Sequence, residues 1–241
     1  MQSLENKIIA VLGYHKIGEY PPNGWYTWSY VPVDIFENHL QYLADDNWKV
    51  LSFEQFIAGL SNLELFPQKS ILITFDDGYR SNMEIALPIL RKYNYPAVMF
   101  VPTAFVGGYN AFDADIFYEP EENICTWEEL IELERSGISI QSHGVNHPHF
   151  SDISNEELKK EIAASREILE QKLNKKIEAF AFPYGDNGEV NRTDSILQQS
   201  GYKAAFLYSG GLIKLNGIKP YQINRIPVGP DTDLKTQLEK E

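Results

Sequence analysis

The sequence contains little cysteine, little positive charge and no long apolar run, and each shortage argues against a class of protein. A single cysteine among 241 residues, Cys125, cannot form an intrachain disulfide or a thiolate metal cage. The 21 Lys and Arg against 34 Asp and Glu give a net charge of −13, which argues against the basic stripe that nucleic-acid binding requires. We therefore expect no nucleic-acid partner.

The sequence also predicts no membrane-spanning or secretory segment. Its longest apolar runs, such as residues 8–13 and 97–101, are far shorter than the roughly 18 residues of a membrane span. Residues 1–7 are polar and no apolar stretch of a signal peptide follows them. We expect a chain without a transmembrane segment that is either cytoplasmic or the mature form of an exported protein.

Apolar residues are plentiful enough to build a core, at 43% of the chain with 13% aromatics. No repeat, linker or shift in composition divides the sequence, so residues 1–241 are predicted to form a single domain and the protein a monomer. Short apolar runs alternate with helical patterns, which predicts an α/β fold with a parallel sheet or barrel. The expected strands are Ile8 to Tyr14, Lys49 to Leu51, Ser70 to Phe75, Ala97 to Val101, Ile138 to Gln141, Ile177 to Phe182, Ala204 to Tyr208 and Gln222 to Pro227.

Three predicted helices begin with a capping box, in which a hydroxyl and a Glu or Gln three residues later satisfy free amides. The boxes are Ser52 with Gln55, Thr126 with Glu129, and Ser154 with Glu157. The last opens the clearest helix, whose apolar residues fall on one face. Residues 103–125 are rich in glycine and aromatics and are predicted to form a long loop.

Candidate catalytic residues follow several of these strands, at the carboxyl ends where parallel α/β folds place their chemistry. Asp76 and Asp77 end the strand 70–75, and two adjacent carboxylates repel each other unless a positive group compensates them. A plain Asp-Gly turn explains the same pair equally well. His143 and His147 follow the strand 138–141 and, with one carboxylate, make a three-ligand metal site with open positions.

Two further strand ends carry weaker signals. Pro183 has no N–H, so the first free amide after the strand 177–182 is that of Tyr184, which could face an oxyanion. A simple turn accounts for these residues almost as well. His15 follows the strand 8–14, and a lone histidine there is more often a hydrogen-bonded core residue.

The motifs Thr74-Phe75-Asp76-Asp77-Gly78, Ser142-His143-Gly144-Val145-Asn146-His147-Pro148 and Phe180-Ala181-Phe182-Pro183-Tyr184-Gly185 resemble, in this order, those of the polysaccharide deacetylases. This family is also called the NodB-homology domain or carbohydrate esterase family four, and the resemblance spans about residues 8–230. It implies a distorted (β/α) barrel of about seven parallel strands and metal-dependent removal of N-acetyl groups from sugar polymers. By the same resemblance, Asp77, His143 and His147 would hold a divalent metal, usually Zn²⁺, and Asp76 would be the general base.

The sequence departs from the family pattern at three places. Gly144 stands where a Ser or Thr often supports the histidine loop, and Ala181 stands where many members have an Arg that tunes the base. We predict that Arg225 replaces this Arg beside Asp76, against the alternative of a surface salt bridge. No histidine follows His149 to supply the usual late catalytic acid.

That last departure matches the branch that resembles biofilm poly-N-acetylglucosamine deacetylases, in which the motif order is permuted and an early Tyr-His pair supplies the acid. Tyr14 and His15 occupy that place, so His15 becomes the predicted general acid. Trp25 and Trp28, with Pro183 and Tyr184, are the predicted substrate-binding residues, since aromatic faces stack on sugar rings.

The expected partner is an N-acetylated polysaccharide or oligosaccharide, and the expected location is the bacterial cell surface or exterior, with the signal or anchor absent from this chain. Peptidoglycan, chitin oligomers and acetylated xylan remain alternative substrates. A different metal hydrolase, a non-haem iron oxygenase and a catalytically silent carbohydrate-binding domain remain alternative functions.

Overall fold

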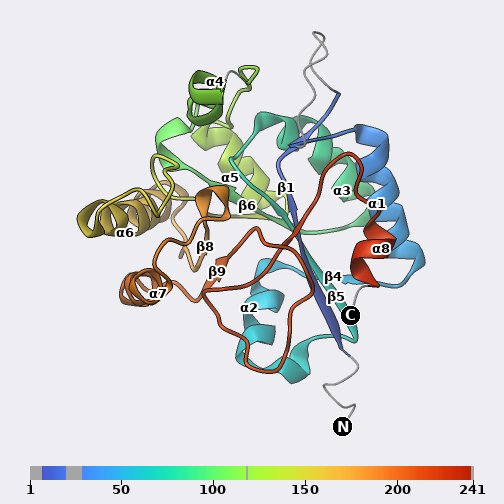
Figure 1. Ribbon diagram of the computed structural model, residues 1–241. Coiled ribbons are helices and arrows are strands. Elements are labelled where there is room, and N and C mark those ends of the chain that lie inside the picture. Colours follow the sequence, from blue (N-terminus) through green and yellow to red (C-terminus); the bar gives the residue numbers. More distant parts are fainter. Residues whose placement is uncertain (1–6, 20–28, 118, 240–241) are drawn as a thin grey trace.

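The computed structural model describes residues 7–19, 29–117 and 119–239 of the chain. These form an α/β fold in which a curved parallel sheet is surrounded by helices (Figure 1). The strands of the sheet are β1 (Ile8–Tyr14), β4 (Lys49–Val50), β5 (Lys69–Phe75), β6 (Ala97–Val101), β7 (Ile138–Ser142), β8 (Ala179–Ala181), β9 (Ala204–Phe206) and β10 (Ile226–Pro227). Two short strands, β2 (Lys16–Ile17) and β3 (Tyr30–Val31), pair with each other beyond the end of β1.

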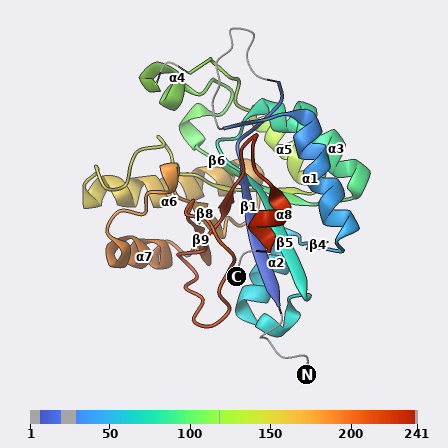
Figure 2. The ribbon, with the colours of Figure 1, turned by 45° about the vertical axis from the view of Figure 1, so that its right-hand side comes forward.

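Helices connect most of these strands. They are α1 (Val33–Asp45), α2 (Phe53–Ser61), α3 (Leu87–Tyr93), α4 (Ala111–Phe117), α5 (Trp127–Arg135), α6 (Asn155–Leu173), α7 (Val190–Gln199) and α8 (Leu234–Leu238), with short turns η2 (Leu63–Leu65), η3 (Asn82–Ala86), η4 (Thr103–Phe105) and η5 (Pro183–Gly185). In Figure 2, α6 and α7 lie side by side on one flank of the sheet, and α1, α3 and α5 cover another. The helices thus cover the outer side of the sheet, as a barrel of βα units requires.

The sheet curls toward a closed barrel. Its strands are parallel in the order β10-β1-β5-β6-β7-β8-β9, with β4 beside β5. Residues 220–225 then run beside β9, where the Leu207 N–H donates to the Ile223 carbonyl at 2.8 Å and the Ile223 N–H donates to Ala205 at 2.9 Å. The same segment continues into β10 next to β1. The seven parallel strands of this order, with β4 as an eighth beside β5, form a curled half-barrel and confirm the predicted fold class.

Side chains on the two sides of the sheet belong to two separate apolar clusters, because successive strand residues point in opposite directions. Val11 and Leu72 lie in the cluster that contains Phe56 of α2. Leu12 and Ile73, one residue further along each strand, pack in the larger cluster with α1, α3, α5 and α6. These strands are buried on both sides, which is why they are continuously apolar in the sequence.

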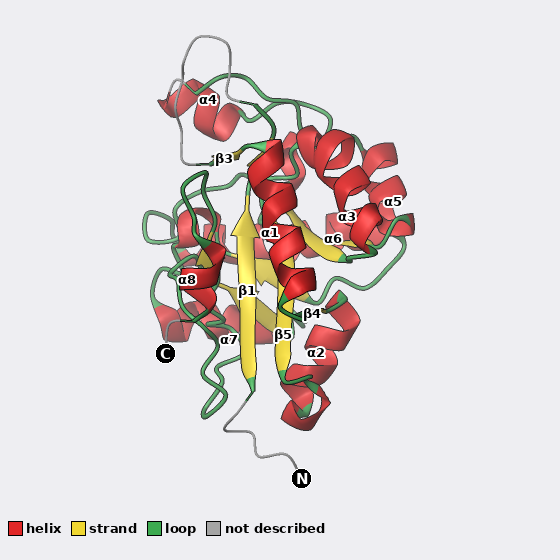
Figure 3. Cartoon of the chain, turned by 90° about the vertical axis from the view of Figure 1, so that its right-hand side faces the viewer, coloured by secondary structure: helices red, strands yellow, loops and turns green. Residues whose placement is uncertain are grey.

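The carboxyl ends of the strands meet at one end of the molecule. Figure 3 shows β1 pointing toward β3 and α4, while the first residues of β1 and β5 lie at the opposite end. The loops after β1, β5, β7 and β8 therefore converge beneath α4. This arrangement gathers residues from distant parts of the sequence at one edge of the sheet.

The structure confirms the strands 8–14 and 97–101 at the predicted bounds. The other predicted strands begin or end at different residues. The three capping boxes are present as predicted. The predicted loop 103–125 is not wholly irregular, since it contains η4 and α4 and pairs Tyr109 with Asn123. In the described ranges, no helix combines the length and the apolar character needed to cross a membrane.

Candidate active site

A cavity of about 450 Å³ opens at the carboxyl end of the sheet. Its walls come from the loops after β1, β5, β7, β8 and β9 and from the segment around α4. The lining residues are His15, Ser29, Asp76, Asp77, Tyr79, Asp113, Phe117, Glu119, His143, His147, His149, Phe182, Tyr184, Gly185 and Tyr208. Most of the polar side chains are carboxylates or imidazoles. These are the groups that bind metals and transfer protons in enzyme active sites.

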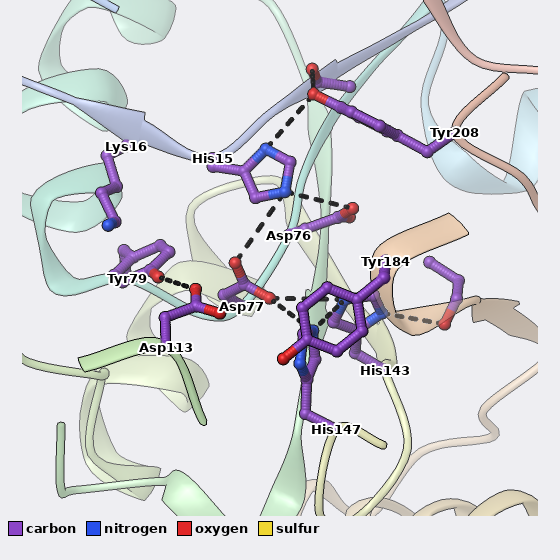
Figure 4. Close-up of polar contacts among 12 residues, drawn as sticks. His15, Lys16, Asp76, Asp77, Tyr79, Asp113, His143, His147, Tyr184 and Tyr208 are labelled. Carbon is purple, nitrogen blue, oxygen red and sulfur yellow. Dashed lines mark hydrogen bonds and ion pairs between the residues drawn. The ribbon is translucent and has the colours of Figure 1, made fainter. Parts of the chain in front are cut away.

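Asp77, His143 and His147 bring three ligand atoms to one point in this cavity (Figure 4). The Asp77 Oδ1 atom lies 3.3 Å from His143 Nε2 and 3.2 Å from His147 Nε2, and the two Nε2 atoms are 3.2 Å apart. A tetrahedral ion with bonds of about 2.0 to 2.1 Å separates its ligand atoms by about 3.3 Å. The triangle therefore has the dimensions and the donor set of a divalent-metal site with an open position.

Hydrogen bonds and burial prepare these ligands for a cation. His143 donates its Nδ1 proton to the Ala181 carbonyl at 2.8 Å, which fixes the ring with Nε2 turned toward Asp77. Burial raises the pKa of Asp77, but hydrogen bonds with His143 and His147 outweigh it and leave that pKa well below its usual value. Burial lowers the pKa of His147, which favours the neutral imidazole that binds metals.

The backbone is strained where it presents these groups. Asp77, His147 and Tyr184 all have positive φ angles, of 69°, 56° and 55°. Such angles are uncommon outside glycine, although Asp and His adopt them more readily than bulky residues, and they cluster at functional sites. The tight turn after β5 continues through Gly78, with φ of 74°, and aims the Asp77 carboxylate into the cavity.

Asp76 is paired with Arg225, which the chain delivers from the segment just before β10. The guanidinium donates from Nη1 to Asp76 Oδ1 at 2.6 Å and from Nη2 to Oδ2 at 2.7 Å, and Arg225 is fully buried. Its Nε also donates to the Leu207 carbonyl at 2.9 Å. Burial raises the pKa of Asp76, but the charge and hydrogen bonds of Arg225, together with the charges of His143 and His15, outweigh it and keep the pKa below its usual value. Asp76 is thus held as an oriented carboxylate.

We predict that Arg225→Met destabilises the fold by about 3 to 5 kcal/mol, because it leaves the Asp76 carboxylate buried without its partner. The double variant Arg225→Met/Asp76→Asn should recover much of that loss, since neither charge of this pair then remains buried. Chemical denaturation of the wild type, both single variants and the double variant measures the coupling. A double variant that loses the sum of the single losses would contradict the pairing.

His15 lies across the cavity from the histidine pair. Its Nε2 atom is 4.0 Å from Asp76 Oδ2 and 3.9 Å from Asp77 Oδ2, and its side chain is about one-fifth exposed at 21%. Burial lowers the pKa of His15, while the neighbouring Asp77 and Asp76 carboxylates oppose that shift. Tyr14, the other member of the predicted pair, points away and contacts His39 Nδ1 through its hydroxyl at 3.0 Å.

Tyr208 orients His15 and was not identified from the sequence. Its hydroxyl donates to the Gly13 carbonyl at 3.2 Å and lies 3.4 Å from His15 Nδ1. A Cβ at Gly13 would meet the Tyr208 ring at 2.7 Å, so glycine is required there. A glycine inside an otherwise apolar strand is the one sequence signal that pointed to this close approach.

The predicted substrate-binding residues are only partly brought to the cavity. Tyr184 is 37% exposed, lines the cavity and stacks on His149 at 4.0 Å between ring centroids. Pro183 is buried near Gly144 and is not among the lining residues. Trp25 and Trp28 lie outside the described residues.

Acidic residues from the α4 segment form a further wall that the sequence did not reveal. Asp113 accepts a hydrogen bond from the Tyr79 hydroxyl at 3.4 Å, and Glu119 accepts one from the buried Lys16 at 2.7 Å. Burial, followed by the charges of Asp77 and Glu119, raises the pKa of Asp113 to about 7. These contacts depend on α4 folding over the cavity, so the prediction of an irregular loop for residues 103–125 did not include them.

Comparison with known proteins agrees with this site. A family model described as polysaccharide deacetylase matches residues 65–205, more than half of the chain, so the chain belongs to the polysaccharide deacetylase family. The predicted family membership is thereby confirmed. The matched region includes Asp76, Asp77, His143 and His147, whereas His15 and Arg225 lie outside it.

Among curated relatives, YxkH of Bacillus subtilis is 26% identical over 201 residues, which cover 83% of this chain and 66% of the relative. The poly-β-1,6-N-acetyl-D-glucosamine N-deacetylase of Staphylococcus epidermidis is 28% identical over 159 residues, covering 62% of this chain and 52% of that protein. The chain thus spans two thirds or less of the length of these relatives.

Solved structures give a fuller match in length. The Streptococcus pyogenes deacetylase PplD, in complex with acetate, superposes with a TM-score of 0.83 at 28% identity over 97% of this chain and 99% of PplD. IcaB from Ammonifex degensii has the same fold, with a TM-score of 0.77 at 24% identity over 93% of each chain. The curated relatives include proteins named as poly-β-1,6-N-acetyl-D-glucosamine N-deacetylases, the kind of enzyme whose branch the sequence resembles.

Proposed function

We propose that this chain is a metal-dependent polysaccharide N-deacetylase that hydrolyses the N-acetyl amide of an N-acetylglucosamine polymer and releases acetate. The observation that carries the proposal is the Asp77-His143-His147 triangle with Asp76 and His15 at its open side. A spare, oriented carboxylate beside three metal ligands suits hydrolysis, which needs a base for water. The relatives named as poly-β-1,6-N-acetyl-D-glucosamine N-deacetylases favour that polymer.

Asp77, His143 and His147 would hold the ion, for which Zn²⁺ fits the donor set and the spacing. When bound, such an ion would polarise a carbonyl oxygen and lower the pKa of a bound water to about 7. The residues of the protein supply the general base, the general acid and the hydrogen-bond donor to the oxyanion. Burial of all three ligand residues keeps competing water away from the site.

Asp76 acts as the general base and takes the proton of the attacking water on a carboxylate oxygen. Its two oxygens are already oriented by Arg225, and each retains a lone pair for the water. The Tyr184 N–H donates to the oxyanion that forms on the acetyl carbonyl. His15 donates a proton from Nε2 to the departing nitrogen, which would otherwise leave as a very poor anion. The products are acetate and a free amine on the sugar.

The aromatic faces of Tyr184 and Phe117 at the cavity rim offer stacking surfaces for sugar rings. A polymer substrate of this kind remains outside the cell, so we place the working enzyme at the cell surface or exterior. Acetate release from β-1,6-linked N-acetylglucosamine oligomers, compared with chitin oligomers, peptidoglycan and acetylated xylan, tests the substrate. We expect the β-1,6-linked oligomers to be deacetylated fastest, and a clear preference for another polymer would contradict that choice.

We predict that His15→Ala lowers kcat for acetate release by about 10²-fold or more, the usual contribution of a positioned acid. Metal binding should be unchanged, because His15 is not one of the three ligands. Tyr208→Phe is the matched control, since it keeps the ring and removes only the hydroxyl beside His15 Nδ1, and we expect a smaller loss. Near-normal turnover in His15→Ala would exclude His15 as the acid.

A further inference from the structure

The loop that carries His147 is held from outside by a carboxylate of α6. Glu161 accepts the Val145 N–H at 2.7 Å and the Asn146 N–H at 2.9 Å on Oε2, and the Asn146 side-chain amide at 2.7 Å on Oε1. The residue is only 6% exposed. A buried carboxylate is costly unless it is hydrogen bonded, and here the compensating donors belong to the loop itself.

The other side of the same loop is bound to η4. The Thr103 N–H donates to the Gly144 carbonyl at 3.1 Å, and the Ala104 N–H donates to Val145 at 3.0 Å. The carbonyls of the loop therefore face η4 while its N–H groups face Glu161. Glu161 thus accepts the N–H groups of the two residues directly before the metal-binding histidine.

The geometry of Gly144 leaves room for this contact. Gly144 has φ of 83°, and a Cβ placed on it would lie 3.0 Å from Glu161 Oε2. The carboxylate thus occupies the space next to residue 144 that a side chain would need. The positive φ of 56° at His147 means that the loop must also be held in a strained conformation.

We propose that Glu161 is a positioning residue of the metal centre: by holding residues 145 and 146 it directs the His147 Nε2 atom toward Asp77 and His143. The inference rests on the metal site of the proposed function. Glu161 is not one of the three ligand residues, so its effect passes through the loop backbone. Residues that orient metal ligands in this way typically change metal affinity about 10- to 100-fold when they are removed.

The test measures the Zn²⁺ dissociation constant by competition with a chromophoric chelator, together with the melting temperature of the metal-free protein. Glu161→Ala should weaken Zn²⁺ binding about 10- to 100-fold. The matched control is Glu170→Ala on the same helix, whose carboxylate accepts the Ile177 N–H at 3.0 Å far from the histidine loop. This control should lower the melting temperature without changing the Zn²⁺ affinity.

Glu161→Gln should restore the affinity to within about threefold of wild type, because its amide oxygen can accept both backbone N–H groups and the Asn146 amide can turn over. Should Glu161→Ala not fold, Asn146→Asp places a like charge opposite Glu161 on an exposed residue, and we expect about tenfold weaker Zn²⁺ binding. Wild-type affinity in Glu161→Ala or Asn146→Asp, or equal losses in Glu161→Ala and Glu170→Ala, would overturn the inference. A wild-type protein that binds no divalent ion would instead overturn the proposed function.

Discussion

Asp76→Asn is expected to bind Zn²⁺ as the wild type does and to release acetate about 10² to 10⁴ times more slowly, the range for losing a positioned general base. The amide cannot take a proton from water, whereas Asp77, His143 and His147 are untouched. Metal content and acetate release, measured on the same preparation, separate the two functions of the adjacent carboxylates.

The matched control is Asp115→Asn, an exposed carboxylate on α4 that contacts the Tyr109 hydroxyl. It should leave both metal content and turnover unchanged. Near-normal turnover in Asp76→Asn would show that another group takes the proton. Loss of Zn²⁺ from that variant would show that Asp76, and not Asp77 alone, contributes to the ligand set.

His147→Ala should abolish stoichiometric Zn²⁺ binding and reduce acetate release to background, because only two protein ligands remain. The adjacent histidine in the same loop provides the control. His149 is not a member of the ligand triangle, and it lies in an exposed position stacked on Tyr184. His149→Ala should therefore retain one Zn²⁺ per chain, measured by elemental analysis after dialysis. Stoichiometric Zn²⁺ in His147→Ala would remove the proposed metal site.

The sequence predicted the parts of the site that lie directly after long, apolar strands. Asp76 and Asp77 follow β5, and His143 and His147 follow β7, so the parallel order of the sheet alone brings them together. The cation beside Asp76 could also be expected, since two adjacent carboxylates require compensation. Its source, Arg225, was predicted from its place near the end of another strand, because the 149 positions between it and Asp76 in the sequence give no spacing signal.

Features that depend on tertiary contacts were missed or misjudged. Strands β8, β9 and β10 are shorter than the apolar runs that predicted them, because the sheet curls and each chain segment leaves it after two or three residues. Tyr208 and Glu161 carry no motif of their own and become part of the site only when their elements pack against it. The α4 segment was predicted as a loop because residues 103–125 are rich in glycine and aromatics. A helix of only seven residues gives too weak a pattern to change that prediction.

The most direct test of the central claim is acetate release from β-1,6-linked N-acetylglucosamine oligomers by protein that is first stripped with a chelator and then reloaded with Zn²⁺. The account predicts no acetate from the stripped protein, a rise in activity that saturates near one Zn²⁺ per chain, and one free amine formed for each acetate. Unchanged acetate release after complete metal removal, or binding of the oligomer without any acetate release by the reloaded protein, would contradict it.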